Sequence, residues 1–330
     1  MPRIDIHSHF ISPEFVDHLE GRSELPMIEY RDGKRFIRSA PGLVVPVIAK
    51  MTDLRQKLTD MDELGVDFAV LSHAIPGPEI LGGTEADDWA RRINDHLSNL
   101  VEMAPDRISA WGMIGFGDSD ESRAEMDRCV KELGFPGFQL YSNVRGEPLD
   151  SLPVLEVIAH AAELDVPLNL HPTVPLNQVG MDHLTVLTGL GFVADTSLNT
   201  LRLILSGLFD RYPNLKLIVP HVGGVLPYIH GRVAAHSGKA HIQASEVELE
   251  HPLGHYLKNL YMDTVTGDVA ALRCAHGLLG PERLLYGTDH PFANYRQAAG
   301  IVEELDLPED EEKLIYVENA QRLLGLNHGS

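Results

Sequence analysis

Eight short apolar segments recur along the 330-residue chain, and most are followed by an amphipathic segment. Most of the apolar segments are continuous rather than alternating, as in strands buried on both faces of a parallel sheet. Between them lie helix-like segments such as residues 53–65, which carry an apolar stripe and end at Gly65. This alternation predicts a closed (β/α)8 TIM barrel. The predicted strands are residues 3–9, 68–73, 108–115, 137–142, 166–171, 215–221, 259–264 and 283–289.

One segment, at about residues 20–50, interrupts the alternation. There Asp32-Gly33 lies between β-prone residues, a pattern typical of a hairpin turn. We therefore predict a distorted barrel with a small antiparallel flap inserted after the first strand, near the carboxyl-terminal mouth. The alternative is a disordered loop. We expect a single domain over residues 1–330, because no linker or low-complexity run divides the chain.

Composition excludes several classes of partner. The net charge of −21, from 27 basic and 48 acidic residues, should repel nucleic acid and anionic membranes. No apolar run is long enough to span a membrane, and the first residues lack the apolar core of a signal peptide. The two cysteines, Cys129 and Cys274, have no CxxC partner, which is typical of free thiols in a reducing compartment. We expect a cytoplasmic protein that binds small molecules.

Histidines and one aspartate stand where predicted strands end, and in barrels of this kind function collects at those ends. A single histidine at a strand end is usually an ordinary polar residue, and His73 shows that position alone is weak evidence. A histidine pair spaced by one residue is stronger, because both side chains point to the same face of a strand. The set of strand ends is stronger still: His7, His9, His171, His221 and Asp289.

The chemistry of this set favours one divalent cation. His7, His9, His171 and Asp289 offer the N/O ligands that Zn²⁺ prefers, with Mn²⁺ as the alternative. His221 is then free to act as a base beside metal-bound water. An alternative for Asp289 is a helix N-cap, although Gly-Thr-Asp-His-Pro is a poor helix opening. The strand at 137–142 ends without a lysine that could bridge two metals, so a mononuclear site is expected.

Two glycines follow His221. Gly223-Gly224 would permit close approach of the backbone to a ligand, or would simply form a tight strand-to-helix turn.

The chain resembles the amidohydrolase superfamily, and within it the branch of aminocarboxymuconate-semialdehyde decarboxylase and the related γ-resorcylate, 5-carboxyvanillate and salicylate decarboxylases. The resemblance implies that His7, His9, His171 and Asp289 bind the metal and that His221 assists metal-bound water or protonation. The segments that carry it are RIDIHSHF, LTDMDELGVDFAVLS, LNLHP, LRLILSGLFDRYPNLKLIVPHVGGVLPYIHGR and LLYGTDHPF.

The same resemblance bears on substrate binding and assembly. Arg232 matches an arginine that, in the semialdehyde decarboxylase, enters the neighbouring subunit's active site to hold a substrate carboxylate. This implies a homodimer with Arg232 contributed in trans; the alternative is a surface salt-bridge residue. Val45 stands where that enzyme has a second substrate-binding arginine, so the pocket is more apolar and a dicarboxylate is doubtful. Whether Arg35 or Arg38 compensates is open.

Three further residues near the strand ends are predicted substrate contacts: Tyr141, His290 and Phe292. His290 stands where an aromatic residue often follows the metal aspartate in the family, and packing is its alternative role.

These observations favour non-oxidative decarboxylation of a small unsaturated or aromatic carboxylic acid, with Asp289 or a His221–water pair supplying a proton. A second hypothesis is hydrolysis of an ester, lactone or amide, or hydration of a double bond, by the same metal site. A third is a non-catalytic metal-binding protein. Product mass separates the first two, because one loses carbon dioxide and the other gains water.

Overall fold

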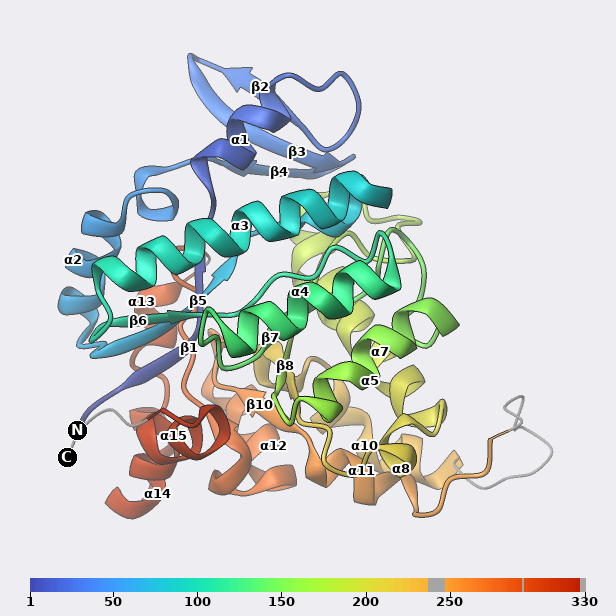
Figure 1. Ribbon diagram of the computed structural model, residues 1–330. Coiled ribbons are helices and arrows are strands. Elements are labelled where there is room, and N and C mark those ends of the chain that lie inside the picture. The colour runs from blue at the N-terminus through green and yellow to red at the C-terminus, as the bar shows by residue number, and fades with distance from the viewer. Residues whose placement is uncertain (237–246, 293, 327–330) are drawn as a thin grey trace.

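The computed structural model describes residues 1–236, 247–292 and 294–326. Eight parallel strands surround the core, and their order follows the sequence (Figure 1). They fall into a three-stranded sheet, β1-β5-β6, and a five-stranded sheet, β11-β10-β9-β8-β7. The strands are β1 (Ile4–Phe10), β5 (Phe68–His73), β6 (Ile108–Ala110), β7 (Phe138–Tyr141), β8 (Leu168–His171), β9 (Leu217–Val219), β10 (Tyr261–Asp263) and β11 (Leu284–Leu285).

Short contacts close the two seams between these sheets. Gly112 bridges Phe138 of β7 on one side, and Ser8 of β1 bridges His290 beyond β11 on the other. At the second seam the Asp289 backbone N–H donates to the carbonyl of His7 at 2.8 Å. The predicted TIM barrel is therefore confirmed, although most of its strands are shorter than predicted.

Helices cover the outside of the barrel (Figure 1). The predicted helix at residues 53–65 begins after an Asp53 cap, whose carboxylate accepts from the backbone N–H of Arg55 at 2.8 Å, and ends at left-handed Gly65. The longer helices are α1 (Pro13–Glu20), α2 (Leu54–Leu64), α3 (Gly83–Met103), α4 (Ser119–Lys131), α5 (Leu152–Glu163), α7 (Phe192–Leu205), α10 (Leu226–His236) and α12 (Val269–Leu279).

Shorter helices connect these elements. The α-helical ones are α6 (Leu184–Val186), α8 (Leu208–Arg211), α9 (Pro220–Gly223), α11 (Leu253–Asn259), α13 (Tyr295–Ala298), α14 (Glu309–Lys313) and α15 (Asn319–Leu324). The single turns of 3₁₀ or π type are η1 (Ala49–Met51), η2 (Pro78–Leu81), η3 (Leu187–Gly191), η4 (Pro281–Arg283), η5 (Glu303–Leu305) and η6 (Leu314–Glu318).

The segment predicted as a hairpin forms a three-stranded antiparallel sheet of β2 (Met27–Arg31), β3 (Lys34–Ala40) and β4 (Leu43–Pro46). The β2–β3 turn is Asp32-Gly33, and both residues have positive φ, as a tight hairpin requires. Figure 1 shows this sheet with α1 beyond the carboxyl end of β1. Its apolar face packs into the main core through Ile37 and Leu43, so it is anchored to the barrel.

Apolar side chains fill the interior. The largest fully buried side chain is Trp111, whose indole N–H donates to the Ile6 carbonyl at 2.9 Å. A second apolar cluster joins residues of β1 and β5 to Leu323 and Leu324 of α15. In the described residues, none of the helices combines the length and the apolar character needed to cross a membrane.

Candidate metal centre

Four buried side chains converge at the carboxyl ends of the strands: His7 and His9 from β1, His171 from β8, and Asp289 after β11. One potential ligand atom from each lies within 4.8 Å of all the others. Nε2 of His9 is 3.1 Å from Nε2 of His7 and 3.0 Å from Oδ1 of Asp289. The structure thus brings together the four residues that the sequence predicted as ligands of one metal ion.

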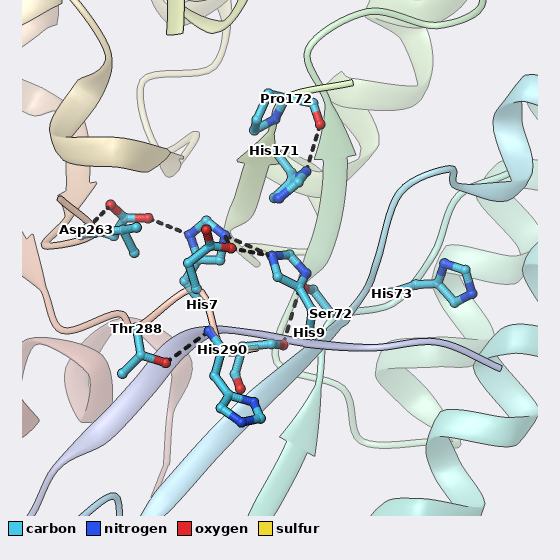
Figure 2. A network of polar contacts seen from close by, with 12 residues as sticks. His7, His9, Ser72, His73, His171, Pro172, Asp263, Thr288 and His290 are labelled. Carbon is cyan, nitrogen blue, oxygen red and sulfur yellow. Dashed lines mark hydrogen bonds and ion pairs between the residues drawn. The ribbon is translucent and has the colours of Figure 1, made fainter. Parts of the chain in front are cut away.

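The other ring nitrogen of each histidine has its own partner (Figure 2). Nδ1 of His7 is 2.6 Å from Oδ2 of Asp263, Nδ1 of His9 is 2.9 Å from the Ser72 hydroxyl, and Nδ1 of His171 is 2.7 Å from the Pro172 carbonyl. These contacts orient the rings and leave each Nε2 for the shared centre. Metal-bound histidines are commonly held in this way. Three imidazole nitrogens and one carboxylate therefore fit a single divalent cation.

Asp263 was missed in the sequence analysis. It is the last residue of β10 and is fully buried. Its Oδ1 accepts from the backbone N–H groups of Val222 and Val265, at 3.2 and 3.0 Å, so the carboxylate is fixed while Oδ2 holds His7. An acidic residue next to the last position of the predicted strand at 259–264 was the available signal.

Burial and neighbouring charges shift the pKa values of the histidines in this group in different directions. Burial lowers the pKa of His7, but the hydrogen bond and charge of Asp263, with the charge of Asp289, outweigh it and raise that pKa to about 9. Burial and the neighbouring His7 hold the pKa of His9 well below its ordinary value. Burial raises the pKa of Asp289. The centre concentrates carboxylates around buried imidazoles, which suits a cation.

His221 lies beside the ligand group but outside it. Its ring centroid is 5.3 Å from that of His7 and 6.3 Å from that of His171. Within the described part of the chain its buried Nδ1 has no hydrogen-bond partner. Burial lowers the pKa of this imidazole, which favours the neutral form. His221 and Val222 both have left-handed φ, near 50°, a conformation that costs energy for such residues.

The glycines after His221 allow tight packing. A Cβ on Gly223 would lie 2.4 Å from the sulfur of Met262, and one on Gly224 would lie 2.5 Å from the Ser197 hydroxyl. Both glycines have positive φ. The pair therefore forms a tight turn against β10 and α7.

Residues 4–326 match the model of the family described as Amidohydrolase. This chain belongs to the amidohydrolase family. It is 32% identical over 297 residues to γ-resorcylate decarboxylase of Polaromonas sp. (strain JS666), covering 83% of this chain and 90% of that protein. It is 28% identical over 277 residues to 2-amino-3-carboxymuconate-6-semialdehyde decarboxylase of Dictyostelium discoideum, covering 82% and 76%.

A solved structure is similar over the whole chain. Dihydroxybenzoic acid decarboxylase from Polaromonas sp. JS666, with bound manganese and the inhibitor 2-nitroresorcinol, superposes with a TM-score of 0.81 and 27% identity. The match covers 99% of this amidohydrolase and 98% of that chain. The predicted branch of the superfamily is confirmed, since its relatives include decarboxylases of both named kinds.

In this amidohydrolase a cavity of about 650 Å³ opens on the ligand group. His171, Asp289 and His221 line it, as do two of the predicted substrate contacts, Val45 of β4 and Phe292. The Phe292 ring also packs against His9, with centroids 5.2 Å apart. The inserted sheet therefore contributes one wall of the cavity.

The other predicted substrate contacts do not line this cavity. The Tyr141 hydroxyl donates to the His73 carbonyl at 3.1 Å, and the Tyr141 ring packs against His171. His290 is turned away from the ligand rings, as Figure 2 shows. Arg232 is exposed on α10. Tyr141 and His290 were predicted to contact substrate. In the structure their side chains instead form hydrogen bonds with neighbouring protein groups.

The buried side chain of Lys57 explains the orientation of His290. The sequence analysis did not identify this residue. Nζ of Lys57, on α2, lies 2.6 Å from Nδ1 of His290 and donates to the Ser8 hydroxyl at 3.1 Å. Asp60 accepts from Nε2 of His290 at 2.8 Å. Burial lowers the pKa of Lys57 to about 7 despite the opposing charges of Asp5 and Asp60. Lys57 lies three residues after Leu54, on the apolar stripe, and that position was the signal.

Proposed function

We propose that this amidohydrolase is a metal-dependent, non-oxidative decarboxylase of small aromatic carboxylic acids. The observation that carries the proposal is that the His7–His9–His171–Asp289 group adjoins a mostly apolar cavity, whose wall includes His171 and Asp289. The similarity to γ-resorcylate decarboxylase over most of both chains supports the same reaction class.

Residues that line the cavity would position the substrate carboxylate and its ring next to the metal-binding group. When bound, a divalent cation would supply an electrostatic clamp for the substrate carboxylate. Phe292 and Val265 line the same cavity and keep bulk water from the ring. The bond between the ring carbon and the carboxylate carbon breaks, its electron pair stays on the ring carbon, and carbon dioxide leaves. A proton must then reach that carbon.

We propose that two residues handle this proton. Asp289 and His221 both line the cavity. The buried, unpartnered Nδ1 of His221, within the described residues, has hydrogen-bonding capacity that the fold leaves unused. Asp289 is held by its backbone N–H, which donates to the His7 carbonyl. We assign proton delivery to this pair, with His221 as the partner that is not a metal ligand.

The direct test uses hydroxylated benzoates and the metal-loaded protein in D₂O. The expected product has lost the mass of carbon dioxide and carries one deuterium at the former carboxyl position. A product that keeps all its carbon and gains water would support hydrolysis or hydration instead and would overturn the proposal.

The identity of the metal is part of the proposal. Three imidazoles and a carboxylate suit Zn²⁺ and also accept Mn²⁺, and the similar Polaromonas structure contains manganese. We propose one divalent ion per chain. Metal analysis of the purified protein, followed by reconstitution of the metal-free form with each ion, identifies the one that restores turnover.

We further propose a homodimer in which Arg232 completes the neighbouring site. Arg232 is exposed on α10, and Tyr228 on the same helix is 84% exposed. A solution mass of two chains, together with loss of substrate affinity in Arg232→Gln, is expected. A monomer with full affinity in that variant contradicts the proposal.

A further inference from the structure

The cavity beside the metal centre has an unusual lining for a site that receives an acid. Among the residues that the structure describes, no arginine or lysine side chain lines it. Leu43 and Val45 of β4, Leu184 of α6, and Phe192 of α7 supply its apolar wall. Within the described residues of this chain, the metal-binding group is therefore the one place in this wall where a bound cation would offer a carboxylate a compensating positive charge. The Arg232 proposed to arrive from the neighbouring chain would hold that same carboxylate.

Apart from His221, whose Nδ1 is left unpartnered among the described residues, three polar side chains in the wall already contact other protein groups. The Thr188 hydroxyl donates to the Leu184 carbonyl at 2.9 Å, and the Thr288 hydroxyl donates to the Asp5 carboxylate at 2.6 Å. The Tyr295 hydroxyl accepts from Lys50. Burying a charged group without a partner costs several kcal/mol, so this wall disfavours a second carboxylate.

Lys50 does not supply the missing charge. It approaches Tyr295 from outside the lining, and its ammonium group is paired with Asp60 at 2.8 Å. The negative charge of Asp60 largely cancels the attraction that the Lys50 ammonium group would exert on a ligand carboxylate.

The volume of the cavity is also informative. Ligand pockets of roughly 300–1,000 Å³ accept drug-sized molecules, and this one measures about 650 Å³. An unsubstituted hydroxybenzoate would leave much of this volume to water against apolar side chains. An apolar substituent would displace that water and gain free energy from burial.

We propose that the preferred substrates are aromatic monocarboxylates that carry an alkyl or aryl substituent, which occupies the wall formed by Leu43, Val45, Leu184 and Phe192. The inference rests on the proposed function for the position of the carboxylate at the metal group. It goes beyond that function by naming the class of substituent and the residues that select it.

The test measures binding separately from turnover. Isothermal titration of the metal-loaded protein uses salicylate, salicylates with a methyl, propyl or pentyl group para to the carboxylate, and salicylate with a second carboxylate at that position. Affinity should rise about three- to fourfold for each buried methylene. The dicarboxylate should bind more weakly than salicylate. Release of carbon dioxide is measured on the same series.

Two matched variants locate the effect. Leu184 lines the cavity and is 48% exposed, whereas Val186, on the same helix, is 38% exposed and does not line it. Leu184→Arg should strengthen binding of the dicarboxylate and remove most of the gain from alkyl groups. Val186→Arg should bind the whole series as the parent does. Both positions are exposed enough for either variant to fold.

The outcomes separate the two proposals. Affinity that rises with alkyl length without release of carbon dioxide supports the substituent class and overturns decarboxylation. Release of carbon dioxide with affinities that do not depend on alkyl length overturns the substituent class and leaves decarboxylation standing. Absence of binding by every alkyl acid, or equal effects of the two arginine variants, also overturns the inference.

Discussion

Asp263 fixes His7: its Oδ2 lies 2.6 Å from Nδ1 of the imidazole, and both side chains are completely shielded from solvent. The backbone N–H groups of Val222 and Val265 hold the other carboxylate oxygen. One buried acid thus sets the position of a predicted metal ligand and ties it to the turn that carries His221.

Replacing Asp263 with asparagine should weaken metal binding about 10- to 100-fold, since the amide cannot accept the Nδ1 proton as a carboxylate does. Metal affinity is measured by competition with a chelator. Asp268→Asn, a helix cap in the same segment, serves as the control and should leave affinity unchanged. Equal affinities in the Asp263 variant and its parent would show that this contact does not support the site.

His221→Asn should lower turnover by about 10²- to 10⁴-fold, the usual contribution of a positioned proton-transfer group. Asparagine tolerates the left-handed backbone found at this position, so the turn should persist. Metal content should stay at one ion per chain. His230→Asn, on the exposed face of α10, is the control. Loss of metal together with activity would instead place His221 among the ligands.

Lys57→Met should destabilise the fold by about 3–5 kcal/mol, because it removes one partner from a buried charged network. The free energy of unfolding is obtained from urea titration. Lys50→Met removes the cation that pairs directly with Asp60, but Lys50 is partly exposed, so its loss should cost about 1 kcal/mol or less. Similar costs for both variants would contradict a special role for the buried cation.

Glu79 in η2 should make stability depend on pH. It is buried, and burial raises its pKa from 4.5 to about 8. Folding therefore favours its protonated form. The stability this contributes is complete below about pH 4.5 and is lost as the pH rises toward about 8. One proton sets a slope of at most about 1.4 kcal/mol per pH unit.

Glu79→Gln should remove this component of the pH dependence and unfold at higher urea concentration than the parent at alkaline pH. Glu121→Gln, on the exposed surface of α4, should follow the parent. If Glu79→Gln and the parent lose stability in parallel as the pH rises, the carboxyl group is not the cause.

The ligands could be predicted from sequence because each follows a recognisable apolar strand, and parallel strands end at one rim of a barrel. Asp263 also ends such a strand, yet its role became evident only from its distance to Nδ1 of His7. The direction of a ring nitrogen depends on contacts between distant segments, which a strand pattern does not contain.

Tyr141 and His290 show the same limit. Both were predicted to contact substrate, but in the structure their polar atoms are bonded to the His73 carbonyl and to Lys57 and Asp60. Lys57 itself was hidden because a lysine within a helical stripe is usually at the edge of the apolar face. The hydrogen bonds that each side chain forms with neighbouring polar groups therefore determine whether it reaches the cavity.

The position of the metal site at the seam between β1 and the segment after β11 gives a bound cation a structural role as well as a chemical one. His7 and His9 stand on one side of this seam and Asp289 on the other, 280 residues away from His9 along the chain. An ion shared by these residues would clasp the first and last strands of the barrel. Its removal would then leave this seam to its backbone contacts alone, such as the Asp289 N–H donating to the His7 carbonyl, so the ligands of the ion would also contribute to the closure of the barrel.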